Sequence, residues 1–228
     1  MKVIENKVFN SKYNLVFIHG WGGNEKSLLC LADCFKEKYS TYLVCLSGFD
    51  SDLNKVYTIN DYLIEVDNYL KNLNNVILIG HSFGGKISLM LKLLHPEYKV
   101  VSIAPSIYKN PFSLKVFIKI YLYKLLKKLS WKIPLFLKGS QDYQNAHGYL
   151  KNTFNNVCHA YLNKKEIKQL SRCIIIGFSN DQKVNFHNLK KLSKYNNKIE
   201  FYAFYGEHFA YLIYFMEIYH IIKCYIEE

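Results

Sequence analysis

A serine in a glycine-rich turn is the residue of this chain whose neighbours most clearly indicate chemistry. Residues 80–84 read Gly-His-Ser-Phe-Gly, so Ser82 stands at the centre of a G-x-S-x-G pattern. The apolar run 76–79 precedes this pattern, and the helix-compatible stretch 86–95 follows it. A serine held on a tight turn between a strand and a helix projects its hydroxyl out of the backbone. The helix that begins there also directs backbone N–H groups at developing negative charge. The sequence therefore predicts a nucleophilic serine whose own turn supplies part of an oxyanion hole.

A serine hydroxyl near neutral pH also needs a base to take its proton and an acid to orient that base. The chain offers candidates in the order Ser, Asp, His. Asp181 follows the apolar run 173–177, and His208 follows the run 199–205. Both lie where a predicted strand ends and a loop begins. We therefore expect both side chains at the same edge of a sheet as Ser82.

The second half of the oxyanion hole is expected in an early glycine-rich loop. Residues 19–23 read His-Gly-Trp-Gly-Gly and follow the apolar run 15–18. Such a loop lets a backbone N–H approach a substrate oxygen closely. We predict the backbone N–H groups of Trp21 and Phe83 as the two donors, and losing one such donor typically lowers the rate by about 10²–10³.

Alternating strands and helices must position these residues. Apolar runs predict strands, and amphipathic stretches between them predict helices. The strands are expected at residues 15–18, 42–46, 76–79, 100–104, 173–177 and 199–205, and the helices at 27–38, 61–71 and 86–95. Continuous apolar strands that alternate with helices predict an α/β fold, with a mostly parallel central sheet covered by helices on both faces. A length of 228 residues fits one domain over residues 1–228.

Residues 106 to about 170 interrupt this alternation, because they contain no clear strand and are rich in Lys, Leu, Phe and Tyr at helical spacing. We expect an inserted helical lid over the carboxyl ends of the strands, where open α/β sheets bind ligands. Asp142 lies in this segment, so it is a poorer candidate acid than Asp181 and is expected to cap or pair locally.

Within the lid, lysines interleave with apolar residues over residues 113–132. Three interpretations stay open: a helix whose apolar side covers an acyl pocket, a docking surface for an anionic partner, or a membrane-surface helix. The lysines concerned are Lys115, Lys119, Lys124, Lys127, Lys128 and Lys132.

The amino-acid composition limits which partners and which cellular location the sequence predicts. The net charge of +12 attracts anionic partners, but charge alone does not choose among nucleic acid, an anionic membrane and an acidic carrier protein. No base-reading motif accompanies the lysines, so no nucleic-acid role is predicted. The six cysteines show no C-x-x-C spacing, Cys45 and Cys173 are expected to be buried free thiols, and a reducing, cytoplasmic location is expected.

Three further expectations concern cofactors and the membrane. No histidine pair has metal-ligand spacing together with a carboxylate, so no metal is predicted. No phosphate-binding loop occurs, and no cofactor is predicted. Residues 209–226 form the most apolar long stretch, but Glu217, His220 and Lys223 interrupt it. This stretch is expected to be a buried final helix rather than a membrane span.

Through these motifs, the chain resembles the α/β-hydrolase superfamily over nearly its full length. The matching segments are His-Gly-Trp-Gly-Gly at 19–23, Gly-His-Ser-Phe-Gly-Gly at 80–85 and Gly-Glu-His-Phe at 206–209. The first two look most like the small carboxylesterases that cleave the methyl ester of pimeloyl-ACP in biotin synthesis. The resemblance implies that fold, with Ser82 as nucleophile, Asp181 as acid and His208 as base. It also implies that the histidines beside the two loops, His19 and His81, shape those loops.

Two departures from the superfamily pattern stand out. Asp181 is four residues after Gly177 rather than three, and Asn180 holds the usual place of the acid. We expect a loop one residue longer, since Asp181-Gln182-Lys183-Val184 fits the common D-x-x-V ending. Residues 46–50 also lack the proline-glycine-phenylalanine-glycine sequence that is usual at this place.

The expected activity is that of a serine carboxylic-ester hydrolase, with pimeloyl-ACP methyl ester as the substrate that the resemblance implies. An acyl-carrier thioesterase, a general esterase or lipase, and a non-catalytic ligand receptor on the same fold remain alternatives. Acyl carrier proteins are acidic, so the basic lid, with Lys115, Lys119, Lys124, Lys127 and Lys128, would suit such a partner.

Overall fold

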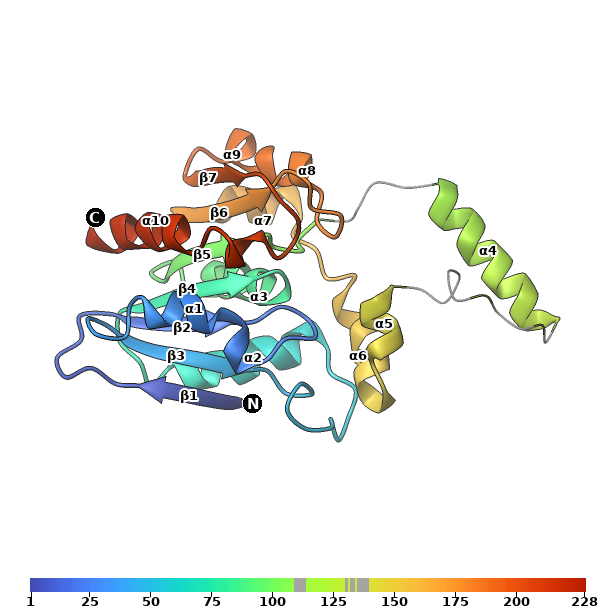
Figure 1. The fold of residues 1–228 in the computed structure, drawn as a ribbon, viewed down its shortest axis with the longest axis horizontal. Coiled ribbons are helices and arrows are strands. Elements are labelled where there is room, and N and C mark those ends of the chain that lie inside the picture. The colour runs from blue at the N-terminus through green and yellow to red at the C-terminus, as the bar shows by residue number, and fades with distance from the viewer. Residues whose placement is uncertain (109–113, 130, 132–133, 135–139) are drawn as a thin grey trace.

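The computed structural model of the protein describes residues 1–108, 114–129, 131, 134 and 140–228, and for residues 114–117 and 120 it describes the backbone alone. A seven-stranded sheet forms the centre of this described part, in the order β1-β3-β2-β4-β5-β6-β7 (Figure 1). The β1/β3 pair is antiparallel, and every other neighbouring pair is parallel. The strands are β1 (Lys2–Asn6), β2 (Asn14–Ile18), β3 (Ser40–Cys45), β4 (Val76–His81), β5 (Lys99–Ile103), β6 (Cys173–Phe178) and β7 (Ile199–Phe204).

Helices cover both faces of the sheet, as the sequence predicts (Figure 1). The helices, with η for a 3-10 helix, are η1 (Glu25–Leu28), α1 (Leu29–Asp33), α2 (Ile59–Leu70), α3 (Phe83–Leu94), α4 (Leu114–Lys128), α5 (Gln141–Asn145), α6 (Gly148–Val157), α7 (Lys164–Gln169), α8 (Phe186–Lys190), α9 (Leu192–Tyr195), η3 (Ala210–Leu212) and α10 (Phe215–Glu227).

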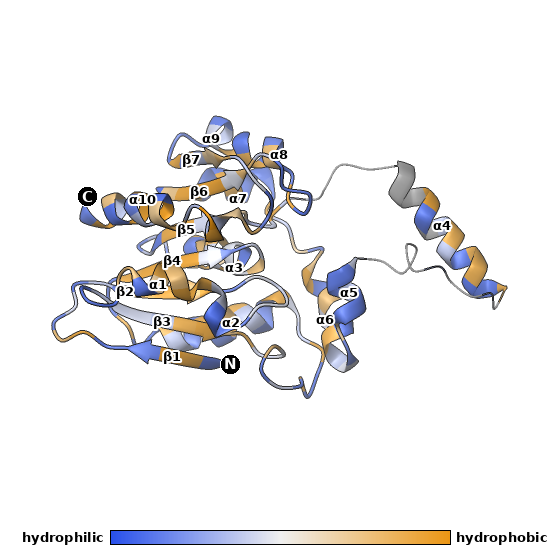
Figure 2. Cartoon of the chain, viewed as in Figure 1, coloured by the Kyte–Doolittle hydropathy of each residue, from blue (hydrophilic) through white to orange (hydrophobic). Residues whose placement is uncertain are grey.

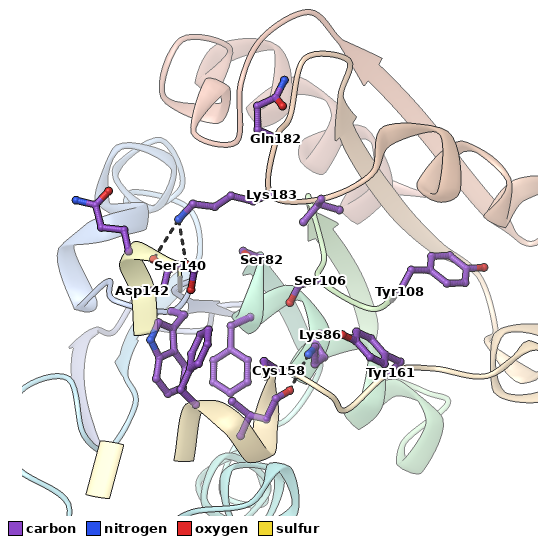
Figure 3. Close-up of a pocket in the computed structure, with 16 residues that line it drawn as sticks. Ser82, Lys86, Ser106, Tyr108, Ser140, Asp142, Cys158, Tyr161, Gln182 and Lys183 are labelled. Carbon is purple, nitrogen blue, oxygen red and sulfur yellow. Dashed lines mark hydrogen bonds and ion pairs between the residues drawn. The ribbon is translucent and has the colours of Figure 1, made fainter. Parts of the chain in front are cut away.

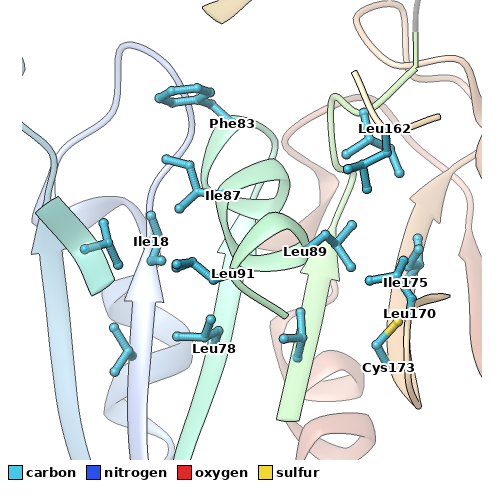
Figure 4. Close-up of a cluster of buried hydrophobic side chains, with 14 of the residues drawn as sticks. Ile18, Leu78, Phe83, Ile87, Leu89, Leu91, Leu162, Leu170, Cys173 and Ile175 are labelled. Carbon is cyan, nitrogen blue, oxygen red and sulfur yellow. The ribbon is translucent and has the colours of Figure 1, made fainter. Parts of the chain in front are cut away.

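The side-chain alternation of the strands divides the core into two clusters. In β2, Val16 and Ile18 pack with α2 and α3 on one face, whereas Leu15 and Phe17 pack with α1 and α10 on the other. Successive side chains of a strand point to opposite faces, so a strand that is apolar throughout needs cover on both sides. Figure 4 shows the first cluster, in which residues of the sheet and of α3 face each other.

One strand and the starts of two helices differ from the sequence-based expectation. Strand β1 was not predicted, because its residues are mostly exposed and its short charged sequence lacks a continuous apolar run. Helix α3 begins at Phe83, three residues earlier than expected, directly after the serine turn. The final apolar stretch is not one helix, because η3 and a turn precede α10, which begins only at Phe215.

The segment between β5 and β6 contains helices α4 to α7 and, among its described residues, no strand. Helix α6 is anchored to the body: Thr153 and Val157 are fully or almost fully buried. Helix α4, by contrast, stands away from the sheet, and Figure 2 shows hydrophobic and hydrophilic residues alternating along it (Figures 1 and 2). Its apolar side chains Ile118, Tyr121 and Leu125 are 48%, 61% and 41% exposed.

Two further expectations, one on the cysteines and one on a membrane span, can be compared with the structure. Cys45 and Cys173 are buried, as predicted, and all six cysteines are unpaired. None of the helices described is both long enough and apolar enough to cross a membrane.

Candidate active site

Ser82 occupies a strained turn between β4 and α3. Its φ of +51° and ψ of −105° lie in a region that residues other than glycine rarely adopt, at a cost of about 1–3 kcal/mol. The Ser82 N–H donates to the carbonyl of Ile103 at 2.8 Å. The Ser82 carbonyl accepts from the N–H groups of Lys86 at 3.0 Å and Ser106 at 3.3 Å. These bonds fix the turn that exposes the hydroxyl.

Two glycines of the motif are required by close backbone packing. A Cβ at Gly80 would collide with the carbonyl of Gly84, the second residue of α3. A Cβ at Gly84 would collide with the carbonyl of Ile18 at the end of β2. Helix α3 therefore approaches the sheet closely enough to begin directly at the nucleophile position.

Asp181 and His208 meet at the same rim. The Nδ1 of His208 lies 2.7 Å from Oδ2 of Asp181, and the two side chains are only 7% and 1% exposed. Since an ionised carboxylate can only accept, Nδ1 carries the proton and Nε2 is left with a free lone pair. That nitrogen can take a proton from a hydroxyl.

The longer loop after β6 holds Asp181 rather than Asn180 in this position. Oδ1 of Asp181 accepts from the backbone N–H groups of Lys183 at 2.7 Å and Val184 at 2.9 Å. The Asn180 N–H donates to the carbonyl of Gly206 at 3.0 Å, which ties this loop to the loop that carries His208. Both oxygens of the carboxylate are thus occupied, and its orientation is fixed.

Trp21 and Phe83 lie together at the predicted oxyanion position. Their rings pack edge to face with centroids 5.5 Å apart, and both residues line the same cavity as Ser82. A Cβ built on Gly20 would lie 3.3 Å from Cβ of Ser82, so the glycine loop passes directly beside the nucleophile position. Within the described part of the chain, neither backbone N–H has a hydrogen-bond acceptor. Phe83 is the first residue of α3, where helical N–H groups lack an intrahelical partner.

His19 fixes the glycine loop through both ring nitrogens. Its Nδ1 donates to the carbonyl of Gly20 at 2.7 Å, and its Nε2 accepts from the N–H of Leu46 at 3.1 Å. Burial lowers the pKa of this imidazole, which keeps it neutral. His19 therefore ties the glycine loop to the end of β3.

His81 supports the backbone of the base. Its Nε2 donates to the carbonyl of His208 at 3.0 Å, and the two rings lie 4.8 Å apart. Burial and the nearby His208 lower the pKa of His81 to about 3. A neutral His81 thus positions His208 and is not available as a base near neutral pH.

A cavity of about 520 Å³ opens beside Ser82 (Figure 3). Trp21, Phe83, Phe154 and Val157 form an apolar side. Helix α6 is held there because Phe154 packs on Trp21, with ring centroids 5.0 Å apart. Among the residues described, no side chain of α4 lines the cavity, and the interpretation of that helix as a cover for the pocket stays a prediction.

Several cavity residues were not predicted from the sequence. Lys86 follows the serine turn on α3, Ser106 lies in the loop after β5, and Tyr161 comes from the segment after α6. The spacing of four residues between Ser82 and Lys86 places both on one face of a helix, and that signal was available in the sequence. The placement of Ser106 and Tyr161 depends on tertiary contacts.

Asp142 does not pair locally, contrary to expectation. Its carboxylate lies 3.2 Å from Nζ of Lys183, which follows β6, and the ion pair joins α5 to the loop of Asp181 (Figure 3). Ser140, not Asp142, caps α5, since its hydroxyl accepts from the N–H of Tyr143.

A family model described as "Alpha/beta hydrolase family" matches residues 15–150, well over half of the chain. The chain belongs to the α/β hydrolase family. The matched region runs from β2 through the serine turn and into the segment between β5 and β6.

Individual relatives match this chain over only part of its length or at low sequence identity. A Haemophilus influenzae protein whose name assigns it provisionally to the esterases and lipases is 38% identical over 87 residues, which make up 36% of this chain and 30% of that protein. The match therefore spans less than a third of that relative. A lipase-esterase related protein from Clostridium acetobutylicum superposes with a TM-score of 0.73 at 21% identity, covering 98% of both chains. An enol-lactonase from Burkholderia xenovorans gives 0.75 at 13% identity, covering 100% of this chain and 96% of that one. These superpositions share the fold.

Proposed function

We propose that the protein is a serine carboxylic-ester hydrolase. The observation that carries the proposal is the buried hydrogen bond between His208 and Asp181, at the rim of the sheet from which the Ser82 turn also projects. This bond leaves Nε2 of His208 as the free base that a serine hydroxyl needs. The esterase and lipase names of relatives agree with this chemistry.

The proposed mechanism follows from the roles of these atoms. Oγ of Ser82 attacks the ester carbonyl carbon while Nε2 of His208 takes its proton, and Asp181 stabilises the imidazolium that forms. The backbone N–H groups of Trp21 and Phe83 hold the oxyanion. His208 then gives the proton to the departing alcohol, and a water molecule, activated by His208, releases the acid from Ser82.

The test is Ser82→Ala, with a serine-directed fluorophosphonate probe as a second readout. We expect ester hydrolysis to fall on the order of 10⁶-fold and labelling to disappear, because a triad without its nucleophile retains little catalysis. Ser193→Ala is the matched control, since Ser193 lies on α9 and bonds only to a backbone carbonyl. If the unaltered protein were neither labelled nor active on esters, a non-catalytic ligand receptor would replace this proposal.

For the physiological substrate we propose the methyl ester of pimeloyl-ACP. The glycine loop and the serine turn resemble the carboxylesterases that act on it, and an apolar-sided cavity beside Ser82 suits an acyl chain. The comparison to make is methyl pimeloyl-carrier against free p-nitrophenyl esters of graded length. Cleavage of free esters alone would contradict this substrate, and release of the acyl chain from the carrier instead of methanol would favour a thioesterase.

We further propose that the acidic carrier docks on α4. Lys119, Lys124, Lys127 and Lys128 are exposed on that helix, whereas the side chains of Lys115 and Lys132 lie outside the described residues. Attraction between exposed charges weakens with salt. We therefore expect KM for the carrier substrate to rise with ionic strength, while KM for a small neutral ester changes little. Equal salt dependence for both substrates would argue against docking at this helix.

A further inference from the structure

Lys86 brings a buried ammonium group to the wall of the cavity. The residue lies on α3 one turn after Ser82 and is only 1% exposed, yet it lines the cavity (Figure 3). Its Nζ donates to the carbonyl of Val157 at 3.0 Å, at the end of α6. In the described part of the chain, no carboxylate lies within ion-pair distance of this ammonium. Burial lowers the pKa of Lys86, and the nearby thiol of Cys158 offsets this only in part. A buried charge without a counter-ion is costly.

Two hydroxyl groups face the same end of the cavity. Figure 3 shows Ser106 and Tyr161 directed toward Lys86, below Ser82. Nζ of Lys86 lies 5.5 Å from the ring centroid of Tyr161, and the N–H of Ser106 bonds to the carbonyl of Ser82. Neither hydroxyl has a hydrogen-bond partner among the residues described. The ammonium keeps two further N–H donors, and each hydroxyl can donate as well, so this end of the cavity offers several hydrogen-bond donors to a ligand.

We propose that Lys86, Ser106 and Tyr161 form a subsite for a carboxylate on the acyl part of the substrate. A carboxylate supplies the missing negative charge and two oxygens with about four acceptor positions for these donors. The acyl part is the part concerned, because His208 must protonate the leaving oxygen from the loop after β7, whereas Lys86 faces the end of α6. The inference rests on the proposed ester hydrolase and not on the carrier-bound substrate, whose second carboxyl is a neutral thioester. It names as the substrate class monoesters of dicarboxylic acids that keep a free second carboxylate.

A purely structural role for Lys86 is the competing explanation, since lysines often bond the last carbonyls of a helix. Lys92 provides a matched comparison. It lies on the same helix, is 3% exposed, and donates to the carbonyls of Pro96 and Tyr98, but it does not line the cavity. Removing either ammonium breaks buried bonds of the same kind, so only a substrate-binding role predicts a difference in selectivity.

The kinetic experiment compares monomethyl esters of succinate, glutarate, adipate and pimelate with methyl esters of the corresponding unbranched monocarboxylic acids. We expect the carboxylate ester to be favoured in kcat/KM by about 10- to 100-fold at one chain length, the range of a hydrogen-bonded charge pair. Lys86→Met removes this preference, and Lys92→Met keeps it. Tyr161→Phe removes a single hydroxyl, is expected to fold, and reduces the preference by a smaller factor. A preference that survives in Lys86→Met, or is absent in the unaltered protein, overturns the subsite.

A binding measurement separates this inference from the proposed activity. Calorimetry on Ser82→Ala measures the affinity for the dicarboxylates themselves against monocarboxylates of equal length, with no turnover needed. Binding that is lost when Lys86→Met is added to Ser82→Ala, together with no esterase activity in the unaltered protein, would retain the carboxylate subsite and remove the hydrolase proposal. Hydrolysis of neutral esters together with no Lys86-dependent binding would retain the hydrolase and overturn the subsite.

Discussion

Hydrogen bonds to three imidazoles decide which residue at the site can take a proton. His19 and His81 each use a ring nitrogen to hold a backbone carbonyl, and burial lowers the pKa of both. Of these three, His208 is the one whose ring N–H is directed at a carboxylate, that of Asp181. A neutral neighbour and a carboxylate partner leave His208 as the group suited to accept and return a proton.

Substituting Asp181 and its neighbour Asn180 in separate variants should show which of the two residues acts as the acid. In Asp181→Asn the amide cannot stabilise an imidazolium and can favour the wrong tautomer, so we expect kcat to fall by about 10²–10⁴. Asn180→Ala, one residue earlier, should change kcat by less than about twofold, because the contribution of Asn180 to the loop bond is its backbone N–H. Equal losses in the two variants would contradict the assignment of the acid.

The pH dependence of selectivity should report the charge of Lys86. Burial lowers its pKa to about 8, so the group is charged below that pH and neutral above it. The facing side chains of Cys158 and Tyr161 have pKa values raised by burial and stay neutral near pH 8. The ratio of kcat/KM for a carboxylate ester over a neutral ester should therefore be constant below about pH 7 and fall above about pH 8. Catalytic steps that both esters share cancel in this ratio, and a ratio that stays level up to about pH 9.5 would contradict the expectation.

At the scale of secondary-structure elements, the sequence predicted the strands whose residues are buried without interruption. The strand runs and the serine turn were predictable, because parallel strands covered on both faces are apolar throughout. The exposed strand β1 carries no such signal. The positions of Asp181 and His208 followed from the ends of β6 and β7. The placement of α6 did not, because its partners Trp21 and Tyr57 lie about 100 or more residues earlier in the chain.

One buried hydroxyl holds α6 to the body and can be tested. Oγ1 of Thr153 accepts from the N–H of Tyr57 at 2.8 Å, and the threonine is fully buried. Thr153→Val keeps the shape but leaves that N–H without its acceptor, which should lower the free energy of unfolding by about 1–3 kcal/mol. Thr153→Ser retains the acceptor and should lose less. Denaturant unfolding measures both variants, and equal losses would assign the effect to packing instead.

At the scale of the whole molecule, the body and helix α4 contribute unequally to stability. The two clusters that cover the sheet contain the buried side chains, whereas α4 leaves apolar side chains exposed. The sequence predicted that an insertion interrupts the sheet. It could not separate a helix that packs from one that does not, since both carry apolar residues at helical spacing.

Substitutions in these two regions should differ in their effect on unfolding. The combined variant Ile118→Gln, Leu122→Gln and Leu125→Gln should leave the free energy of unfolding within about 0.5 kcal/mol, because these side chains are already exposed. Leu91→Ala on α3, where the leucine is fully buried, should cost about 2–5 kcal/mol. Chemical denaturation gives both values, and a large loss in the α4 variant would mean that this helix packs on the body in solution.

The order of strands also predicts which of the proposed site residues is displaced first on partial unfolding. Strand β4, which leads to the proposed nucleophile, has three strands on either side, whereas β7, which precedes the proposed base, is an edge strand paired only with β6. Edge strands fray more readily than central ones, because half of their backbone groups lack a strand partner. If the proposed activity is correct, mild heating or dilute denaturant should therefore abolish it by detaching the imidazole of His208 while the serine turn and most of the sheet remain intact. We expect this loss to be reversible on cooling or dilution, since only one border of the sheet has to re-form.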